Sequence, residues 1–298
     1  MKTLALSFAT LLLLAGCAGG GSVDFSSVDF SVDNPTDAPL RLKIDGTDYE
    51  IAAHQAKALA LKAGEHSLEA PATGPLKFIV YAGRKGGLIN PTLSDYVIVS
   101  ETYVTEASKA KNFIPSGGGA FQLDGVAFDG PFRHVDGLFI DNDWRFGVRE
   151  AFPDSLRGYD AGNGGNIFRK IFTGPDFVAY YEQRTDQPGF FEKNRLHGTP
   201  ARRGLTAPAP LPEFADPATQ AASLRLRELY AQYLRATDPA EQKRLQDQYY
   251  PLISAFTAAT ASLAATRPVA ENLKQNEFVQ RTGEIFGWSA RVENGSAP

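Results

Sequence analysis

One short stretch of the chain, RHVDGLFIDNDW, concentrates side chains that could do chemistry. It holds an imidazole and three carboxylates around an apolar triplet that resembles a strand: His134, Asp136, Asp141 and Asp143. Asp141 and Asp143 lie two residues apart, so their side chains point the same way in an extended segment. Such a group could bind Ca²⁺ through its oxygens or activate a water molecule. The simpler interpretation is a turn, because Asp and Asn hydrogen-bond to their own backbone.

A second group of charged residues is basic and lies further along the chain. Lys193, Arg195, His197, Arg202 and Arg203 stand close together in an otherwise acidic sequence. They could contact an anionic partner such as lipid headgroups. A solvated loop is the simpler interpretation, because the run also contains Gly and Pro and has no helical periodicity.

Motifs of known enzyme classes are missing from the sequence, which bears on the choice between binding and catalysis. The sequence has no Gly-x-Ser-x-Gly elbow and no phosphate-cradling loop or His-Glu-x-x-His helix. We therefore expect a non-catalytic binding or assembly module. The alternative is an envelope hydrolase acting on glycan or peptidoglycan, with acids drawn from the same region: Asp136, Asp141, Asp143 or Asp154. Glycoside cleavage would require paired carboxylates about 5–9 Å apart.

The first residues predict export. Lys2 precedes an apolar run over 4–14 that is broken only by Ser7 and Thr10. A basic start, a short apolar segment and a small-residue end are typical of a secretory signal. The run is too short for a spanning helix, which needs roughly 20 apolar residues.

The sequence Leu14-Ala15-Gly16-Cys17 resembles the lipobox of bacterial lipoproteins. The resemblance implies that residues 1–16 are removed and that Cys17 carries acyl chains. Residues 17–23 would then form a short lipidated tether, which holds the folded body close to the bilayer. By similarity to the enterobacterial sorting pattern, Ala18 favours the outer membrane, facing the periplasm, over retention in the inner membrane.

The cysteine count and the net charge limit the covalent chemistry and the classes of partner that are possible. Cys17 is the sole cysteine, so disulfides within the chain and a cysteine nucleophile are excluded. The formal net charge is −4, whereas nucleic-acid binding needs a basic surface. We expect a membrane contact through lipid, an envelope protein partner, no nucleic acid, and no cofactor beyond the lipid and the Ca²⁺ considered above.

The elements that must position these residues form an α+β chain. Residues 24–128 show short alternating strands and an Asp45-Gly46 hairpin signal. The strings NPTDAPLRLKIDGTDYEI and AGEHSLEA resemble small immunoglobulin-like modules, which implies an antiparallel β-sandwich. The apolar runs at 78–81 and 96–99 predict strands buried on both faces.

Residues 129–298 predict an irregular α+β region that ends in helices. A strand is expected at 177–181. Asp216-Pro217 and Asp238-Pro239 mark two helix starts, which predicts a helical hairpin over about 217–266. We expect the apolar stripe of its second helix to pack against the β region. A final strand is expected over 286–292, paired with another at 278–280.

Overall fold

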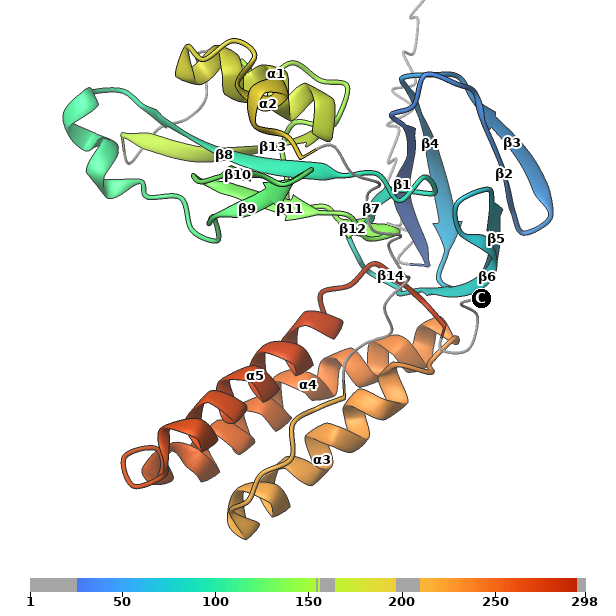
Figure 1. Cartoon of the computed structure of the whole chain (residues 1–298). Coiled ribbons are helices and arrows are strands. Elements are labelled where there is room, and N and C mark those ends of the chain that lie inside the picture. Colours follow the sequence, from blue (N-terminus) through green and yellow to red (C-terminus); the bar gives the residue numbers. More distant parts are fainter. Residues whose placement is uncertain (1–25, 154, 156–163, 197–209, 294–298) are drawn as a thin grey trace, which may run out of the picture.

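A computed structural model of the chain describes residues 26–153, 155, 164–196 and 210–293. Figure 1 shows a β-sandwich, a second sheet covered by two short helices, and three helices that project away from both. The fold is α+β, with antiparallel sheets in the N-terminal part and helices followed by a terminal strand in the C-terminal part, as predicted. The proposed signal peptide and Cys17 lie outside the described residues.

The sandwich is formed by two sheets that share one hydrophobic core. One sheet has the order β14-β6-β5-β2-β3, with the bounds Ala290–Val292, Gly74–Val80, Gly64–Ala70, Leu40–Ile44 and Thr47–Ile51. The other has the order β12-β7-β1-β4, with the bounds Phe139–Asp141, Gly87–Ile89, Ser27–Asn34 and Gln55–Lys62. The sandwich therefore takes strands from far beyond residue 128. The expected hairpin is confirmed, because Asp45 and Gly46 adopt φ of 51° and 75° between the paired strands β2 and β3.

A further three-stranded sheet, which we call the second sheet, extends from the sandwich and carries the candidate site. Its order is β11-β8-β13, with the bounds Phe132–Val135, Tyr96–Val104 and Gly165–Thr173. A hairpin of β9 (Phe121–Leu123) and β10 (Val126–Phe128) and the helices α1 (Gly174–Thr185) and α2 (Phe190–Asn194) share a core with it. The strand expected at 177–181 is wrong. These residues lie in α1, whose start is fixed by the Thr173 side chain accepting a hydrogen bond from the Asp176 amide and by Pro175 in the first turn.

The three projecting helices form what we call the arm: α3 (Pro217–Tyr233), α4 (Pro239–Thr260) and α5 (Val269–Ile285). Both predicted helix starts are confirmed, because Asp216 and Asp238 accept hydrogen bonds from the amides of Thr219 and Glu241. The strand expected at 278–280 is wrong, since Phe278 is a core residue of α5. The final strand β14 pairs instead with β6.

The apolar stripe of α4 packs mainly inside the arm, against α3 and α5, and only its first part approaches the β region. Within the described part of the chain, none of the helices combines the length and the hydrophobicity needed to cross a bilayer.

Strand β6 joins the sandwich to the arm. Its residues alternate between the two cores: Phe78 and Val80 face the sandwich, whereas Ile79 and the following Tyr81 belong to the core of the arm. This explains why the sequence there is apolar at every position, and the prediction of burial on both faces is confirmed.

Candidate metal centre

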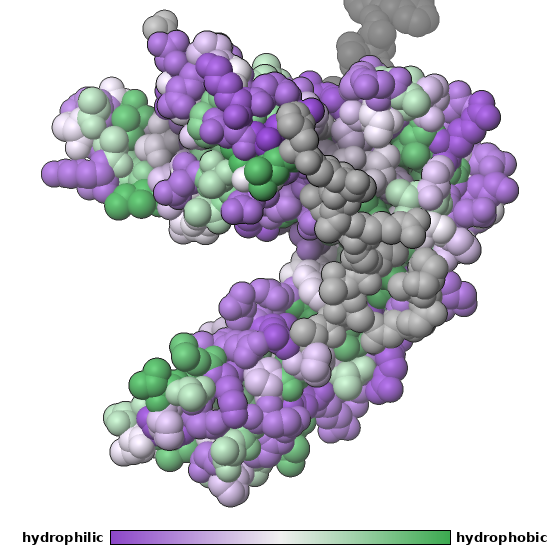
Figure 2. Space-filling view, viewed as in Figure 1, coloured by the Kyte–Doolittle hydropathy of each residue, from purple (hydrophilic) through white to green (hydrophobic). Residues whose placement is uncertain are grey.

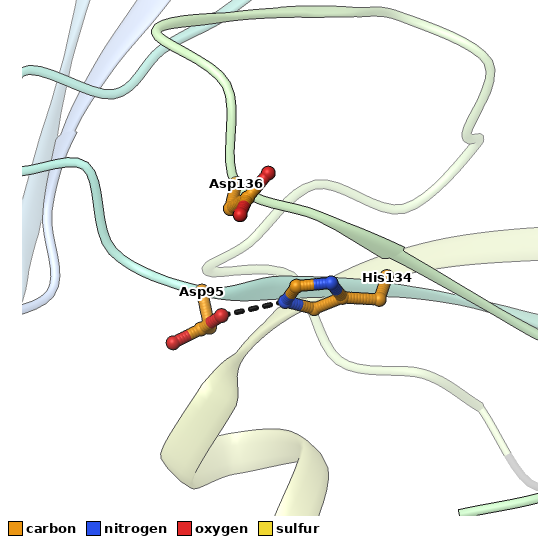
Figure 3. Close-up of side chains that lie close together, drawn as sticks. All are labelled: Asp95, His134 and Asp136. Carbon is orange, nitrogen blue, oxygen red and sulfur yellow. Dashed lines mark hydrogen bonds and ion pairs between the residues drawn. The ribbon is translucent and has the colours of Figure 1, made fainter. Parts of the chain in front are cut away.

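Pairing between β8 and β11 gathers three ligand-type side chains at one end of the second sheet. The two strands are antiparallel, with Val135 opposite Tyr96 and His134 opposite Val97. One step beyond the paired residues, Asp136 faces Asp95. Side chains two apart on a strand share a face, so this pairing brings His134, Asp136 and Asp95 together, and Figure 3 shows the three side chains close to one another.

The donor atoms of these three residues are close enough to share one ion. One donor atom from each of Asp95, His134 and Asp136 lies within 4.8 Å of the others. The Nε2 atom of His134 is 2.5 Å from Oδ1 of Asp95. All three residues are half-buried, so solvent and ions can reach them. An imidazole nitrogen and two carboxylates are a donor set that divalent first-row metals use in proteins.

Two neighbouring elements hold the ligands in place. The His134 ring stacks on Phe121 of β9, with centroids 5.4 Å apart and an interplanar angle of 6°. The carbonyl of Asp95 accepts a hydrogen bond of 2.8 Å from the Gly174 amide, at the start of α1. The imidazole and the Asp95 backbone are thus fixed from two different parts of the chain.

Asn90 connects the backbone on both sides of the site. This residue is fully buried. Its Nδ2 donates to the carbonyl of Ser94 at 2.8 Å and to the carbonyl of Gly137 at 3.2 Å, and its Oδ1 accepts from the Ser94 amide at 3.0 Å. Ser94 precedes Asp95 and Gly137 follows Asp136, so one side chain sets the spacing of the two carboxylate-bearing segments.

The donor group borders two open hollows. One, of about 370 Å³, has His134 and Asp136 in its lining, together with Asp141 and Asp143. The other, of about 480 Å³, is lined by Asp95, the start of α1 and Arg195. A ligand bound at the donor group would therefore be accessible from either hollow.

The four residues predicted from the sequence line one hollow, but their polar atoms have different partners. Asp141 accepts a hydrogen bond of 2.6 Å from the Ser289 amide, and burial raises its pKa above the usual range. Asp143 pairs with Arg133 at 2.5 Å and with Arg169 at 3.4 Å. Asp154, the remaining candidate acid, lies outside the described residues.

The predicted basic stretch is only partly described. Lys193 is exposed on α2. Arg195 pairs with Glu192 at 3.2 Å and lines the larger hollow. His197, Arg202 and Arg203 lie outside the described residues, so the proposed anionic contact stays a prediction.

Sequence reasoning missed Asp95 and Asn90, although a signal for them exists. The tripeptide Asn-Pro-Thr occurs at 34–36 and again at 90–92, just ahead of Asp95. In both copies the Asn side chain donates to the carbonyl four residues later and to a distant segment. A repeated turn motif that precedes a carboxylate and a buried strand could have pointed to this position.

The group formed by Asp95, His134 and Asp136 is thus held by the stacked ring of Phe121, the start of α1 and the buried amide of Asn90. Its donor atoms could hold a small cation at the end of the second sheet. Comparisons of the chain with models of known protein families, with curated proteins and with solved structures found no match.

Proposed function

We propose that this protein is an envelope lipoprotein, anchored through acyl chains on Cys17, that acts as a non-catalytic binding or assembly module through its arm. The observation that carries the proposal is the gathering of exposed apolar side chains on the arm. We further propose that the anchor lies in the outer membrane and that the body faces the periplasm.

Large hydrophobic side chains are exposed on all three helices of the arm. Leu224 of α3 is 57% exposed, Tyr250 of α4 77%, and Val269 and Leu273 of α5 74% and 62%. Figure 2 shows apolar patches toward the free end of the arm. Val269 and Leu273 are four residues apart and so lie on one face of α5, and exposed apolar patches on a globular protein are typical of interaction sites.

The free end of the arm, residues 257–270, is also poor in charge. The sequence has no charged residue between Asp247 and Arg267. Arg267 is half-buried, and its guanidinium donates to Thr219 and Gln275. Most of the exposed residues around it are small: Ala258, Ala259, Ala261, Ala264, Ala265 and Ala270. The low charge favours contact with an apolar surface.

The composition of this end favours a protein partner over a lipid surface. Helices that lie in a bilayer interface carry bulky Trp, Phe or Leu on one face and Lys or Arg on the other. The arm end presents mostly small residues beside Val269 and Leu273, and few cations. Tyr250 adds an exposed aromatic ring, a residue type that is enriched at protein–protein interfaces.

Polar and aromatic contacts attach the base of the arm to β6 and the residues that follow it. Gln242 of α4 is fully buried and bonds to β6, donating to the Val80 carbonyl at 3.0 Å and accepting from the Ala82 amide at 2.8 Å. Tyr81 stacks on Tyr233 of α3 with centroids 4.5 Å apart. A rigid element loses less conformational freedom when it binds.

The hydrolase alternative has weaker support. It needs acids from Asp136, Asp141 and Asp143, but Asp141 accepts from a backbone amide and Asp143 is engaged by two arginines. Asp136 instead lies beside His134 and Asp95.

The anchor is tested in a bacterial cell by labelled palmitate. The wild-type protein should incorporate label and sediment with membranes, whereas Cys17→Ala should do neither. Equal membrane association of both would refute the anchor.

The arm is tested by placing a photocrosslinking residue at Leu273 in the full-length protein, with the same residue at exposed Arg41 of β2 as the control. A defined crosslinked band should form only from Leu273 and should disappear when Val269→Glu is added. Equal crosslinking from Arg41, or insensitivity to Val269→Glu, would refute the proposal. A band that contains only two copies of this chain would also refute it.

A further inference from the structure

We infer that Asp95, His134 and Asp136 form a binding site for one divalent first-row metal ion, with Zn²⁺ as the best-fitting member of this class. The inference goes beyond the proposed role of the arm, which uses a different part of the molecule. Either could therefore fail without the other.

The donor types decide the class of ion. Imidazole suits Zn²⁺ and its first-row neighbours, whereas Ca²⁺ takes six to eight oxygen ligands. Here one of the three donors is the Nε2 atom of His134, and the two others are carboxylates. Three protein ligands leave a fourth position of a tetrahedral Zn²⁺ to water, and the two neighbouring hollows give that water access.

The facing carboxylates give a physical reason for a cation. Asp95 and Asp136 occupy facing positions where β8 and β11 begin and end. Like charges directly opposite each other on neighbouring strands are destabilising. His134 is the one basic member of the three residues, so a divalent ion would balance the two carboxylates more completely.

The supporting residues match what metal sites require. Mutation of the outer contacts that fix ligand orientation typically lowers metal affinity by about 10- to 100-fold. The stacked Phe121 fixes the imidazole plane, and Asn90 fixes the backbone beside both carboxylates. These contacts are already formed, so the main rearrangement on binding would be the separation of His134 Nε2 and Asp95 Oδ1, now 2.5 Å apart, around the ion.

Two other imidazoles in the described part of the chain provide an internal comparison. His66 pairs with Asp45 at 2.7 Å, and His54 pairs with Asp37 at 2.8 Å. Neither belongs to a group of three possible ligands among the described residues. We therefore expect that His66 makes no specific metal site.

The experiment uses the full-length protein in detergent, stripped of metal by a chelator that is then removed. Calorimetry should show one Zn²⁺ bound per chain, and Ca²⁺ should give no comparable binding. Asp136→Asn and His134→Gln should each weaken Zn²⁺ binding by at least about 100-fold, because each removes a ligand. Co²⁺ should give a visible absorption band that is lost in the same variants.

Two controls make the test specific. His66→Gln removes an imidazole of similar setting, and Asp143→Asn removes a carboxylate from the same hollow; neither should change the affinity. The inference is overturned if the wild type does not bind Zn²⁺, if either control weakens binding as much as Asp136→Asn, or if Ca²⁺ binds more tightly. Circular dichroism checks folding, and Asp136→Asn alone suffices if His134→Gln does not fold.

Discussion

The guanidinium of Arg149 donates two hydrogen bonds to Oδ1 of the buried Asp33, from Nη2 at 2.7 Å and from Nε at 3.1 Å. The two residues are 116 positions apart in the sequence. Asp33 lies near the end of β1 and is fully buried. Its second oxygen accepts a hydrogen bond of 2.7 Å from the hydroxyl of Tyr96, at the start of β8. One carboxylate therefore links the sandwich, the second sheet and the loop after β12.

Arg149→Met should destabilise the protein by about 3 kcal/mol, because removing one partner leaves a buried charge without its counter-ion. Burial raises the pKa of Asp33, while Tyr96 and Arg149 oppose this effect. The loss should therefore be larger at neutral pH, where Asp33 is ionised, than at acidic pH, where it is protonated. Urea unfolding at both pH values measures this difference.

The matched control is Arg133→Met, which breaks the pair with the more exposed Asp143. Exposed pairs contribute within about 1 kcal/mol. Equal losses from the two variants would contradict the role given to Asp33.

Lys170 should make stability increase with pH in the alkaline range. Lys170 is 4% exposed, and its ammonium donates to the carbonyls of Gly147, Val148 and Glu150. Burial lowers its pKa from 10.5 to about 8. Between these values the unfolded chain holds a proton that the folded protein has lost, so rising pH favours folding.

The measurement is urea unfolding of the wild type and of Lys170→Met from pH 8 to pH 10.5, the interval between the two pKa values. The wild type should gain stability relative to the variant across this range. A constant difference would show that the Lys170 pKa is unshifted.

Asn90→Ala should weaken Zn²⁺ binding by about 10- to 100-fold, because it removes the amide that sets the spacing of the ligand segments. Asn34→Ala is the matched control. Asn34 is equally buried and makes equivalent turn contacts, but it bonds to Ala38, Ile51 and Ala52 instead. Both variants should lower stability, and only Asn90→Ala should lower the affinity measured by calorimetry.

Gly86→Ala should prevent stable folding, with a loss above about 4 kcal/mol. Gly86 has φ of 75°, and an added Cβ would lie 1.5 Å from the Asp29 carbonyl oxygen in the adjacent strand β1. Gly83→Ala is the control, since its φ is 67° and no atom lies within 4 Å of the added Cβ. It should cost only about 1–2 kcal/mol from backbone strain, as thermal unfolding would show.

Local features of the fold were predictable from the sequence. The caps at Asp216 and Asp238 and the Asp45-Gly46 turn satisfy hydrogen bonds within a few residues, so neighbouring residue types encode them. The apolar run that ends at Tyr81 likewise predicted a strand between two cores. The helix at 177–181 was missed because its cap, Thr173, lies at the end of a strand and was not recognised as a helix start.

The candidate site was only half predictable. His134 and Asp136 belong to one strand end, and their spacing of two already places them on one face. Asp95 joins them only because β8 pairs with β11 in one register, across a separation of 39 residues from His134. Asp141 lies only seven residues from His134 in the sequence, but a bond from the Ser289 amide, 148 residues away, engages its carboxylate.

The sequence by itself determined the helix starts, the tight turns, the α+β class and one side of the candidate metal site. The tertiary structure alone decided which carboxylate completes that site and which apolar surface of the arm stays exposed. The physical reason is the range of the interactions. Caps and turns are closed by neighbouring backbone groups, whereas strand partners and exposed faces depend on the burial of apolar side chains from the whole chain.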